Sequence, residues 1–296
     1  MFDTQYAGHI SSLLAAALWA VASIFFTRLQ DRVHALTLNL LKTGIACLLM
    51  LVTLRVLSGS FWPAKLTSHE FLWLASSGLI GLTIGDSLLF LAFNRIGPRR
   101  ALLFMTLAPP VTALLAWPLL GEPVTLKMAA GIILTIAGVA FVIDARSAEG
   151  EKLLGKGGYL LAAGSAVCQA LGNLGTKLGG QHAPLELGVV RITVGAAGLL
   201  VLMACLRPIV RDLEPLKDAK VFGYVLIATL LGTYLGIWLQ VAGLRYAPAG
   251  IAATLSSTSP IFVLPLAAVW LGDSMNARSV GAALLATCGM ALLFDV

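Results

Sequence analysis

A single acidic residue, Asp86, lies near the middle of an apolar stretch that spans residues 71–93. A carboxylate inside a membrane costs at least ~2.5–3.5 kcal/mol on insertion scales, so such a residue is expected to have either a function or a buried partner. It could bind an amine or shuttle a proton. It could equally form a structural ion pair with Lys42, Arg95 or Arg191. The sequence leaves both roles open.

The composition of the chain is that of a membrane protein. Of its 296 residues, 58% are hydrophobic and 11% are charged, whereas soluble domains carry about 25% charged residues. The net charge of +6 says little about nucleic acid, and none is expected as a partner, because most Lys and Arg fall in short segments between apolar blocks. Four cysteines lie alone in separate blocks, which predicts buried thiols rather than disulfides or a metal site.

The apolar residues form ten blocks, each near the length of helix that crosses ~30 Å of hydrocarbon. We therefore expect an all-α, polytopic membrane protein with ten transmembrane helices. The blocks lie at about residues 8–27, 36–57, 71–93, 101–120, 126–143, 159–178, 185–206, 221–244, 251–271 and 280–294. A polar stretch near the centre divides the chain into a first five-helix repeat at 1–145, a connecting loop at 146–158 and a second five-helix repeat at 159–296.

The two halves share a sequence pattern at a spacing of 151 residues. The matching residues include Gly81 and Gly232, Gly85 and Gly236, Pro109 and Pro260, and Glu122 and Asp273. Such self-similarity indicates an internal duplication of five spans. Because five is odd, the second copy must enter the membrane from the opposite side, which predicts two inverted repeats. Inverted repeats are typical of transporters, with a substrate site near the middle of the membrane where the repeats meet.

Two five-span halves, with Pro109…Leu-Gly-Glu122 in one and Pro260…Leu-Gly-Asp273 in the other, resemble the EamA-type branch of the drug/metabolite transporter superfamily. The resemblance covers nearly the whole chain. It implies a secondary carrier in the plasma membrane, here expected as a bacterial-type inner membrane, that exports amino acids, related metabolites or toxic organic compounds. It also implies a central cavity lined by the first, third and fourth spans of each half. Both termini would then be cytoplasmic, whereas the distribution of Lys and Arg favours the opposite orientation.

Six residues form the predicted substrate-binding set, because they give the spans polar or aromatic faces: Trp19, Asp86, Gln169, Asn173, Tyr234 and Trp238. In the sixth span, Gln169, Asn173 and Lys177 recur every four residues, and a polar stripe on a spanning helix should face the bundle interior. The aromatic residues would suit organic or cationic ligands through cation–π contacts. Asp86 is also the candidate for proton coupling.

A second set of residues is expected to serve packing or gating: Gly81, Gly85, Gly232, Gly236, Pro109 and Pro260. Glycines four residues apart let helices approach closely, and a hinge at the cavity is the alternative. The hydroxyl groups of residues 256–259 could satisfy backbone groups freed by Pro260 or line the substrate path.

Polar residues near the ends of spans have less specific interpretations. Glu122 and Asp273 are expected as helix-end caps or gate contacts rather than as ligands of the solute. Lys42 and Arg191 lie about two turns inside their spans, so they could extend toward the membrane surface.

These patterns predict a secondary active transporter of a small organic solute, an amino acid, amine or related metabolite, that works as an exporter by alternating access. The alternatives are a carrier of nucleotide-activated sugars or lipid-linked groups, which needs several basic residues in the cavity, and a non-transporting membrane receptor. The expected partners are the solute, the lipid bilayer and, as an option, protons. No enzyme is expected, because residues 150–157 only partly match a phosphate-binding loop and lack its hydroxyl residue. No cofactor or metal is expected either.

Overall fold

The computed structural model describes residues 4–29, 32–145, 157–206, 209–259, 261–262, 266 and 277–294, and within these ranges the regular structure is entirely helical. The first half contains α1 (Thr4–Leu29), α2 (Ala35–Ser58), α3 (Ser68–Ser77), η1 (Gly78–Gly85), α4 (Asp86–Met105), α5 (Ala108–Leu120) and α6 (Leu126–Ala145). The second half contains α7 (Gly157–Leu178), α8 (Pro184–Leu206), η2 (Ile209–Lys217), α9 (Ala219–Ala228), η3 (Thr229–Leu235), α10 (Gly236–Tyr246), α11 (Ala249–Ser256) and α13 (Ala277–Phe294).

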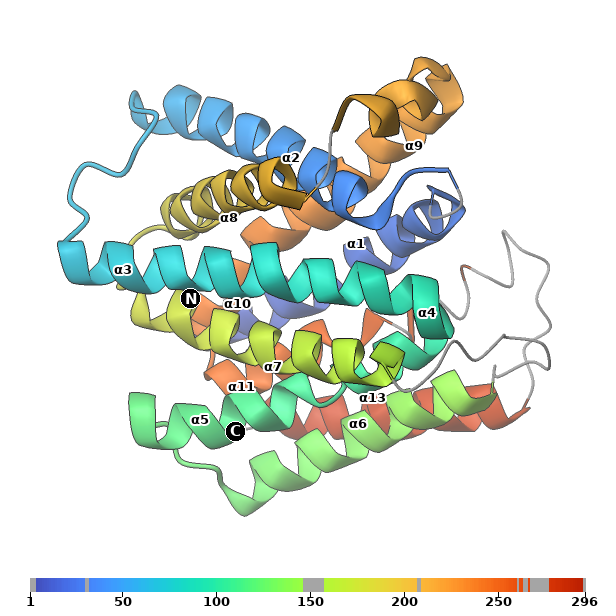
Figure 1. Ribbon diagram of the computed structural model, residues 1–296. Coiled ribbons are helices and arrows are strands. Elements are labelled where there is room, and N and C mark those ends of the chain that lie inside the picture. Colours follow the sequence, from blue (N-terminus) through green and yellow to red (C-terminus); the bar gives the residue numbers. More distant parts are fainter. Residues whose placement is uncertain are drawn as a thin grey trace.

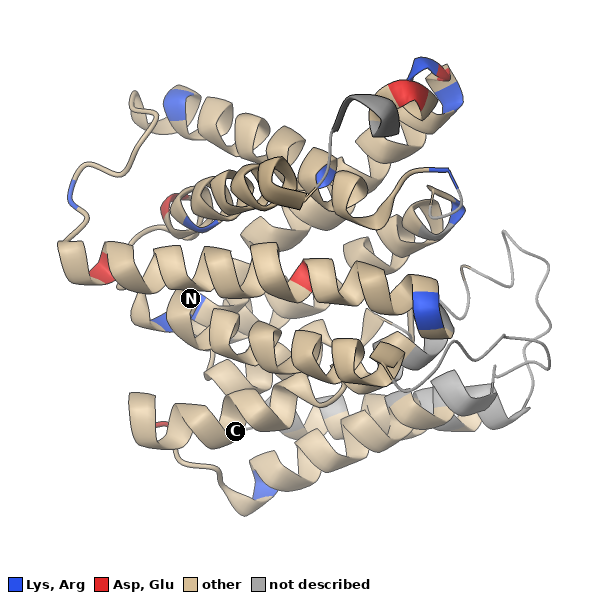
Figure 2. Ribbon diagram, in the orientation of Figure 1, with Lys and Arg blue, Asp and Glu red and all other residues tan. Residues whose placement is uncertain are grey.

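Five of the described helical segments are long and apolar enough to cross a membrane by themselves: Tyr6–Phe26, Ala35–Ser58, Ser68–Ile96, Pro184–Leu206 and Ala219–Tyr246. Shorter apolar helices lie at Ala108–Leu120 and Leu126–Gly138. Large apolar side chains on the outer faces are exposed, as on α2, where Val56 is 76% exposed. Figure 2 shows that charged residues gather mainly near the ends of the helices. The predicted all-α, polytopic membrane fold is confirmed.

The third span of each half contains a π-helix at the same position. The π-helix η1 lies between α3 and α4, and η3 lies between α9 and α10, beginning 151 residues later. The π-helix η1 contains both Gly81 and Gly85, whereas η3 contains Gly232 and ends one residue before Gly236. Wide turns of this kind are rare and are frequent at functional sites. The sequence patterns predicted the glycines but not the π geometry.

The fourth span of each half is interrupted at matching positions. In the first half a turn at residues 106–107 separates α4 from α5, and in the second half a turn at residues 257–258 follows α11. Pro109 lies in the first turn of α5, where a missing backbone N–H costs no hydrogen bond. The span expected at 101–120 is thus divided by a turn shortly before Pro109.

The packing between the halves obeys a pseudo-two-fold symmetry. Helix α1 packs against α10 and η3 of the second half, and its counterpart α7 packs against α4 and η1 of the first half. The equivalent pairs α2 and α8, α5 and α11, and α6 and α13 also lie against each other. In Figure 1 the third span of the first half runs in the opposite direction to α9–η3–α10, and α2 runs opposite to α8. The two five-helix repeats are therefore inverted, as predicted.

Candidate solute-binding cavity

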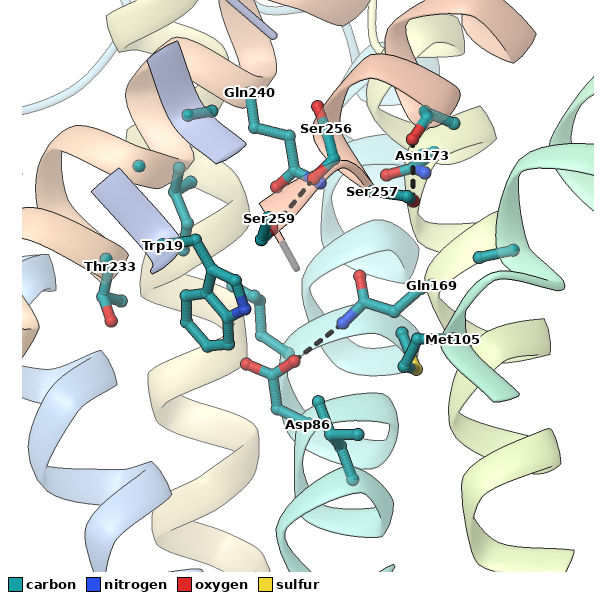
Figure 3. A pocket seen from close by; sticks show the side chains of 18 of the residues that line it. Trp19, Asp86, Met105, Gln169, Asn173, Thr233, Gln240, Ser256, Ser257 and Ser259 are labelled. Atoms are coloured by element: carbon teal, nitrogen blue, oxygen red, sulfur yellow. Dashed lines mark hydrogen bonds between the residues drawn. The ribbon is translucent and has the colours of Figure 1, made fainter. Parts of the chain in front are cut away.

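A cavity of about 160 Å³ lies where the two repeats meet (Figure 3). Its walls come from the first four spans of both halves, including the π-helix region of each third span and the interruption of each fourth span. The surface combines apolar side chains with amide, hydroxyl and charged groups. This is the composition of a site that encloses a small organic molecule and orients it through a few polar contacts.

Much of this lining consists of pairs of residues at the repeat spacing of 151. On the third spans, the pairs are Leu82 and Thr233, Asp86 and Ile237, and Leu89 and Gln240. On the fourth spans, the pairs are Met105 and Ser256, Thr106 and Ser257, and Ala108 and Ser259. The cavity therefore lies on the pseudo-symmetry axis. Its two walls have equivalent backbone positions but carry different side chains.

Asp86 is a buried acceptor with two partners. Its Oδ2 atom accepts a hydrogen bond from Lys42 Nζ at 2.6 Å, which is also an ion pair. Its Oδ1 atom accepts from Gln169 Nε2 at 2.7 Å. In Figure 3 the Trp19 ring lies on one side of the carboxylate and Gln169 on the other. Of the three structural partners considered for Asp86, Lys42 forms an ion pair with it, and Arg191 interacts with it electrostatically without a hydrogen bond.

The π-helix η1 presents carbonyl groups to polar side chains of neighbouring helices. The carbonyl of Leu82 accepts from Asn39 Nδ2 at 3.1 Å, and that of Gly85 accepts from Ser165 Oγ at 2.8 Å. Asn39 Nδ2 also donates to Ser87 Oγ at 3.1 Å. A wide helical turn leaves backbone acceptors open, and in a membrane these must be satisfied within the protein. These bonds fix the turn that carries Asp86.

Lys42 and Arg191 are buried in the bundle, with 1% and 0% of their surface exposed, and both line the cavity. Our expectation that they extend toward the membrane surface is therefore wrong. Lys42 is held by its ion pair with Asp86 and lies 5.6 Å from the centre of the Phe90 ring. The guanidinium nitrogens of Arg191 have no hydrogen-bond partner among the described residues.

Four of the six predicted substrate-binding residues line the cavity together: Trp19, Asp86, Gln169 and Asn173. Tyr234 and Trp238 are absent from this lining and lie against an apolar cluster to which α2, α8 and α10 contribute most residues. The hydroxyl of Tyr234 is 2.8 Å from Thr53 Oγ1 on α2. These two aromatic residues directly follow the cavity residues Thr233 and Ile237 in the sequence. Because adjacent residues of a helix point in different directions, their side chains point away from the cavity.

The predicted packing glycines fall into two groups. In the first half, Gly81 and Gly85 lie against α7, where an added Cβ would come within 3.6 Å of Gly172 Cα and 3.0 Å of Cys168 Cβ, respectively. In the second half, Gly232 and Gly236 line the cavity itself. Pro109 is buried at the start of α5. Pro260 lies outside the described residues, as does Asp273.

Glu122 joins the two halves at one end of the molecule. Its Oε2 atom accepts from the backbone N–H of Ala249, the first residue of α11, at 2.6 Å. Its Oε1 atom forms an ion pair with Lys177 Nζ at 3.2 Å, and Lys177 also donates to the carbonyl of Ala247 at 2.5 Å. Lys177 thus does not join Gln169 and Asn173 in the cavity lining. These contacts are those of a helix cap that also bridges the repeats.

The hydroxyl groups after α11 combine both roles considered for them. Ser257 Oγ donates to the carbonyl of Ala253 at 2.9 Å, and Ser259 Oγ donates to that of Ser256 at 3.3 Å. Ser256, Ser257 and Ser259 also line the cavity, as Figure 3 shows. Ser256 Oγ is buried with no hydrogen-bond partner among the described residues.

The described residues contain no group of three or more His, Cys, Asp or Glu side chains able to hold a metal ion. The ionisable groups that line the cavity are Lys42, Asp86 and Arg191. With inverted repeats around a central cavity, the fold and the site are those of the inverted-repeat class of polytopic membrane proteins, which is typical of transporters.

The chain belongs to the EamA-like transporter family, whose sequence pattern matches residues 6–144 and 156–295. It is 30% identical over 162 residues to the "Uncharacterized transporter YyaM" of Bacillus subtilis (strain 168), a match that covers 54% of this chain and 52% of the relative. The chain thus matches about half the length of that curated relative. A solved structure described as "Crystal structure of protein" matches with a TM-score of 0.79 and 18% identity, over 97% of this chain and 96% of the other, which shows a common fold.

Several cavity residues were not predicted from the sequence, and the repeat could have identified some of them. Shifting Leu82 and Asp86 by 151 residues leads directly to Thr233 and Ile237. The lining by Met105, Thr106 and Ala108 depends on the turn between α4 and α5, for which the sequence offers only the Pro109-Pro110 pair as a signal.

Proposed function

We propose that this protein is a secondary active transporter that exports a small organic solute by alternating access around the central cavity. The observation that carries the proposal is the cavity itself, enclosed between two inverted repeats and lined by symmetry-related residue pairs. Solute sites of inverted-repeat transporters lie near the bilayer midplane at the interface between repeats. The family of the chain supports the same class of function.

The pseudo-symmetry provides a route for switching between two states. The contact of α1 with α10 and η3 and that of α7 with α4 and η1 are two versions of one interface. If the halves exchange their conformations, the end of the cavity that was closed opens and the other end closes. The inward and outward states then have similar energies without any external machinery, since each is built from the same contacts.

We further propose that protons drive the transport through Asp86. Its carboxylate lines the cavity and is the partner of Lys42, so protonation would weaken this ion pair and change the polarity of the cavity. The solute and a proton would then move in opposite directions. The membrane is a bacterial-type plasma membrane, and the protein transports its solute without chemically altering it.

The charges of the cavity favour a small solute over a nucleotide-activated sugar. A diphosphate linkage carries at least two negative charges and needs several basic groups that are not already paired. Of the two basic residues that line the cavity, Lys42 is neutralised by Asp86. Lys177, the basic residue of the polar stripe in the sixth span, pairs with Glu122 and does not line the cavity.

Flux measurements in sealed proteoliposomes test the proposed function. The purified full-length chain would be reconstituted with an outward or inward pH gradient, and radiolabelled L-amino acids, biogenic amines and nucleotide sugars would be added separately. We expect uptake of at least one amino acid, amine or related metabolite above that of protein-free vesicles, dependent on the gradient. A protein that binds solutes but moves none would be a receptor, and uptake of nucleotide sugars alone would support the alternative carrier.

A further inference from the structure

Arg191 on α8 is a buried cation whose hydrogen-bonding groups lack partners. None of its surface is exposed, and the Nε, Nη1 and Nη2 atoms form no hydrogen bond with the described residues. The side chain nevertheless lines the cavity. Asp86 attracts the guanidinium electrostatically, but its two carboxylate oxygens are hydrogen-bonded to Lys42 and Gln169. Buried donors without hydrogen-bond partners are strongly unfavourable, so the guanidinium is expected to bind something that enters the cavity.

The first repeat contains an acidic partner for its buried basic residue, and the second repeat lacks one. Lys42 on α2 and Arg191 on α8 lie at matching places in their halves, and both line the cavity. Lys42 pairs with Asp86, but the residue that corresponds to Asp86 in the second half is Ile237. At these equivalent positions the two halves thus provide two basic residues and one acidic residue.

The backbone near Arg191 leaves room for its guanidinium group. A Cβ atom added to Gly81 would come within 3.2 Å of Arg191 Nη2, so the guanidinium reaches the third span of the first half at a place where no side chain intervenes. Other polar atoms of the cavity are also buried and have no partner among the described residues. They are Thr233 Oγ1 and Ser256 Oγ, which can donate, and Asn173 Oδ1, which can only accept.

The charge balance of the cavity indicates the charge of the missing group. Lys42 and Asp86 neutralise each other, and Arg191 leaves one positive charge. A single carboxylate would balance it, and the planar guanidinium matches the two oxygens of a carboxylate through a pair of parallel hydrogen bonds. An acceptor such as Asn173 Oδ1 would suit an N–H or O–H group elsewhere on the same solute.

We propose that Arg191 binds the carboxylate of the transported solute. The solute would then supply the second repeat with the carboxylate that Asp86 supplies to Lys42 in the first repeat. This inference rests on the proposed function and narrows its substrate class to small carboxylates that carry one net negative charge or are zwitterionic. Free amines, which the carboxylate of Asp86 could otherwise attract, are then not the substrates.

Matched pairs of probes test the carboxylate requirement in the wild-type protein. Each L-amino acid would be compared with its carboxamide, which has nearly the same shape but lacks the negative charge, for binding by thermal shift in detergent and for flux in proteoliposomes. We expect at least one amino acid to bind and move, and its carboxamide to bind about tenfold or more weakly. Carboxamides or amines that move as well as the carboxylates would overturn the inference and leave the proposed function intact.

The outcomes without flux separate the two proposals. Binding of carboxylates but not carboxamides, with no flux of either, would support the subsite and overturn the transporter proposal. Flux and binding absent for every probe would overturn both.

Two substitutions of one residue test the role of Arg191 without removing its charge. Ile237→Asp places an internal carboxylate at the position equivalent to Asp86, and Ile237→Asn places a neutral group of the same size there. We expect the Asp variant to bind the amino acid probe about tenfold or more weakly than the Asn variant, because the protein then supplies the anion itself. Equal binding by the two variants would overturn the inference.

Arg191→Gln should also lose the preference for carboxylate over carboxamide, with Arg191→Lys retaining part of it.

Discussion

Asp86 and Ile237 occupy the same position in the two copies of the third span, 151 residues apart, and both line the central cavity. Asp86 pairs with Lys42, whereas Ile237 joins an apolar cluster that includes Ile192 and Val241. The two repeats thus share the same backbone arrangement, but a carboxylate is present at this position in the first repeat alone. An inverted-repeat carrier can recognise an asymmetric solute only through such differences, since the scaffold that lets it switch must stay nearly symmetric.

The Lys42–Asp86 pair should make single and double substitutions behave very differently. Lys42→Met or Asp86→Leu alone leaves one buried charge without its partner, and we expect each to destabilise the fold by about 3–5 kcal/mol. The double variant leaves neither member of the pair without its partner and should regain much of that stability, less the attraction that Asp86 exerts on Arg191. Unfolding of all four proteins in the same detergent, analysed as a double-mutant cycle, measures the coupling. Additive losses in the double variant would show that the two residues do not depend on each other.

Proton coupling through Asp86 predicts a specific loss in the variant Asp86→Asn. The amide cannot ionise, so a pH gradient should no longer drive accumulation of solute. The measurement is uptake of the transported solute by proteoliposomes with and without the gradient, using protein that elutes as a single species to control for folding. Gradient-driven uptake at the wild-type level in this variant would exclude Asp86 as the coupling residue.

Glycines at the contact between repeats should tolerate a methyl group far less than glycines that face open space. A Cβ on Gly78 would overlap the carbonyl oxygen of Arg191, and a Cβ on Gly232 would lie 2.6 Å from the Cβ of Ala22. We expect Gly78→Ala and Gly232→Ala to cost about 1–3 kcal/mol or more. Gly44 meets nothing within 4 Å, so Gly44→Ala is the matched control and should gain about 0.5–1 kcal/mol through helix propensity. Equal thermal stability of the three variants would contradict the close packing.

The sequence was sufficient for the fold because the relevant physics is periodic and repeated. Apolar blocks of spanning length predict helices, and the match of Gly81 with Gly232 in an odd number of spans predicts inversion. The site was harder to predict. Trp19, Asp86, Gln169 and Asn173 stand out as polar or aromatic residues on spanning helices, and all four line the cavity.

The errors share a physical cause, which is that a side chain's direction depends on local helix geometry. In the η3–α10 segment, Thr233 and Ile237 line the cavity, whereas Tyr234 and Trp238 each follow one residue later and lie against an apolar cluster. The option that Arg191 extends to the membrane surface arose because a long side chain two turns inside a span usually can reach it. Only the tertiary packing shows that the interior surrounds it completely.

The contact of Glu122 with Lys177 and Ala249 should act as a closure at one end of the cavity. It links the loop between α5 and α6 of the first repeat to α7 and α11 of the second, so opening this end requires the contact to break. Glu122→Gln keeps an oxygen for the Ala249 N–H and loses the ion pair, whereas Glu122→Ala loses both and should cost about 1 kcal/mol more through the lost cap. Both variants should favour the state that is open at this end.

Labelling of a cysteine in the cavity measures that shift. With Cys47, Cys168, Cys205 and Cys288 replaced by alanine, Ser256→Cys places one thiol in the cavity lining. A membrane-impermeant maleimide added to the side of the Glu122 contact should react faster in the Glu122→Ala background than in the parent, and more slowly when added to the opposite side. Faster reaction from both sides would indicate general loosening, and an unchanged rate from both sides would show that this contact does not control access. Only opposite changes on the two sides fit a gate, because alternating access requires one entrance to close as the other opens.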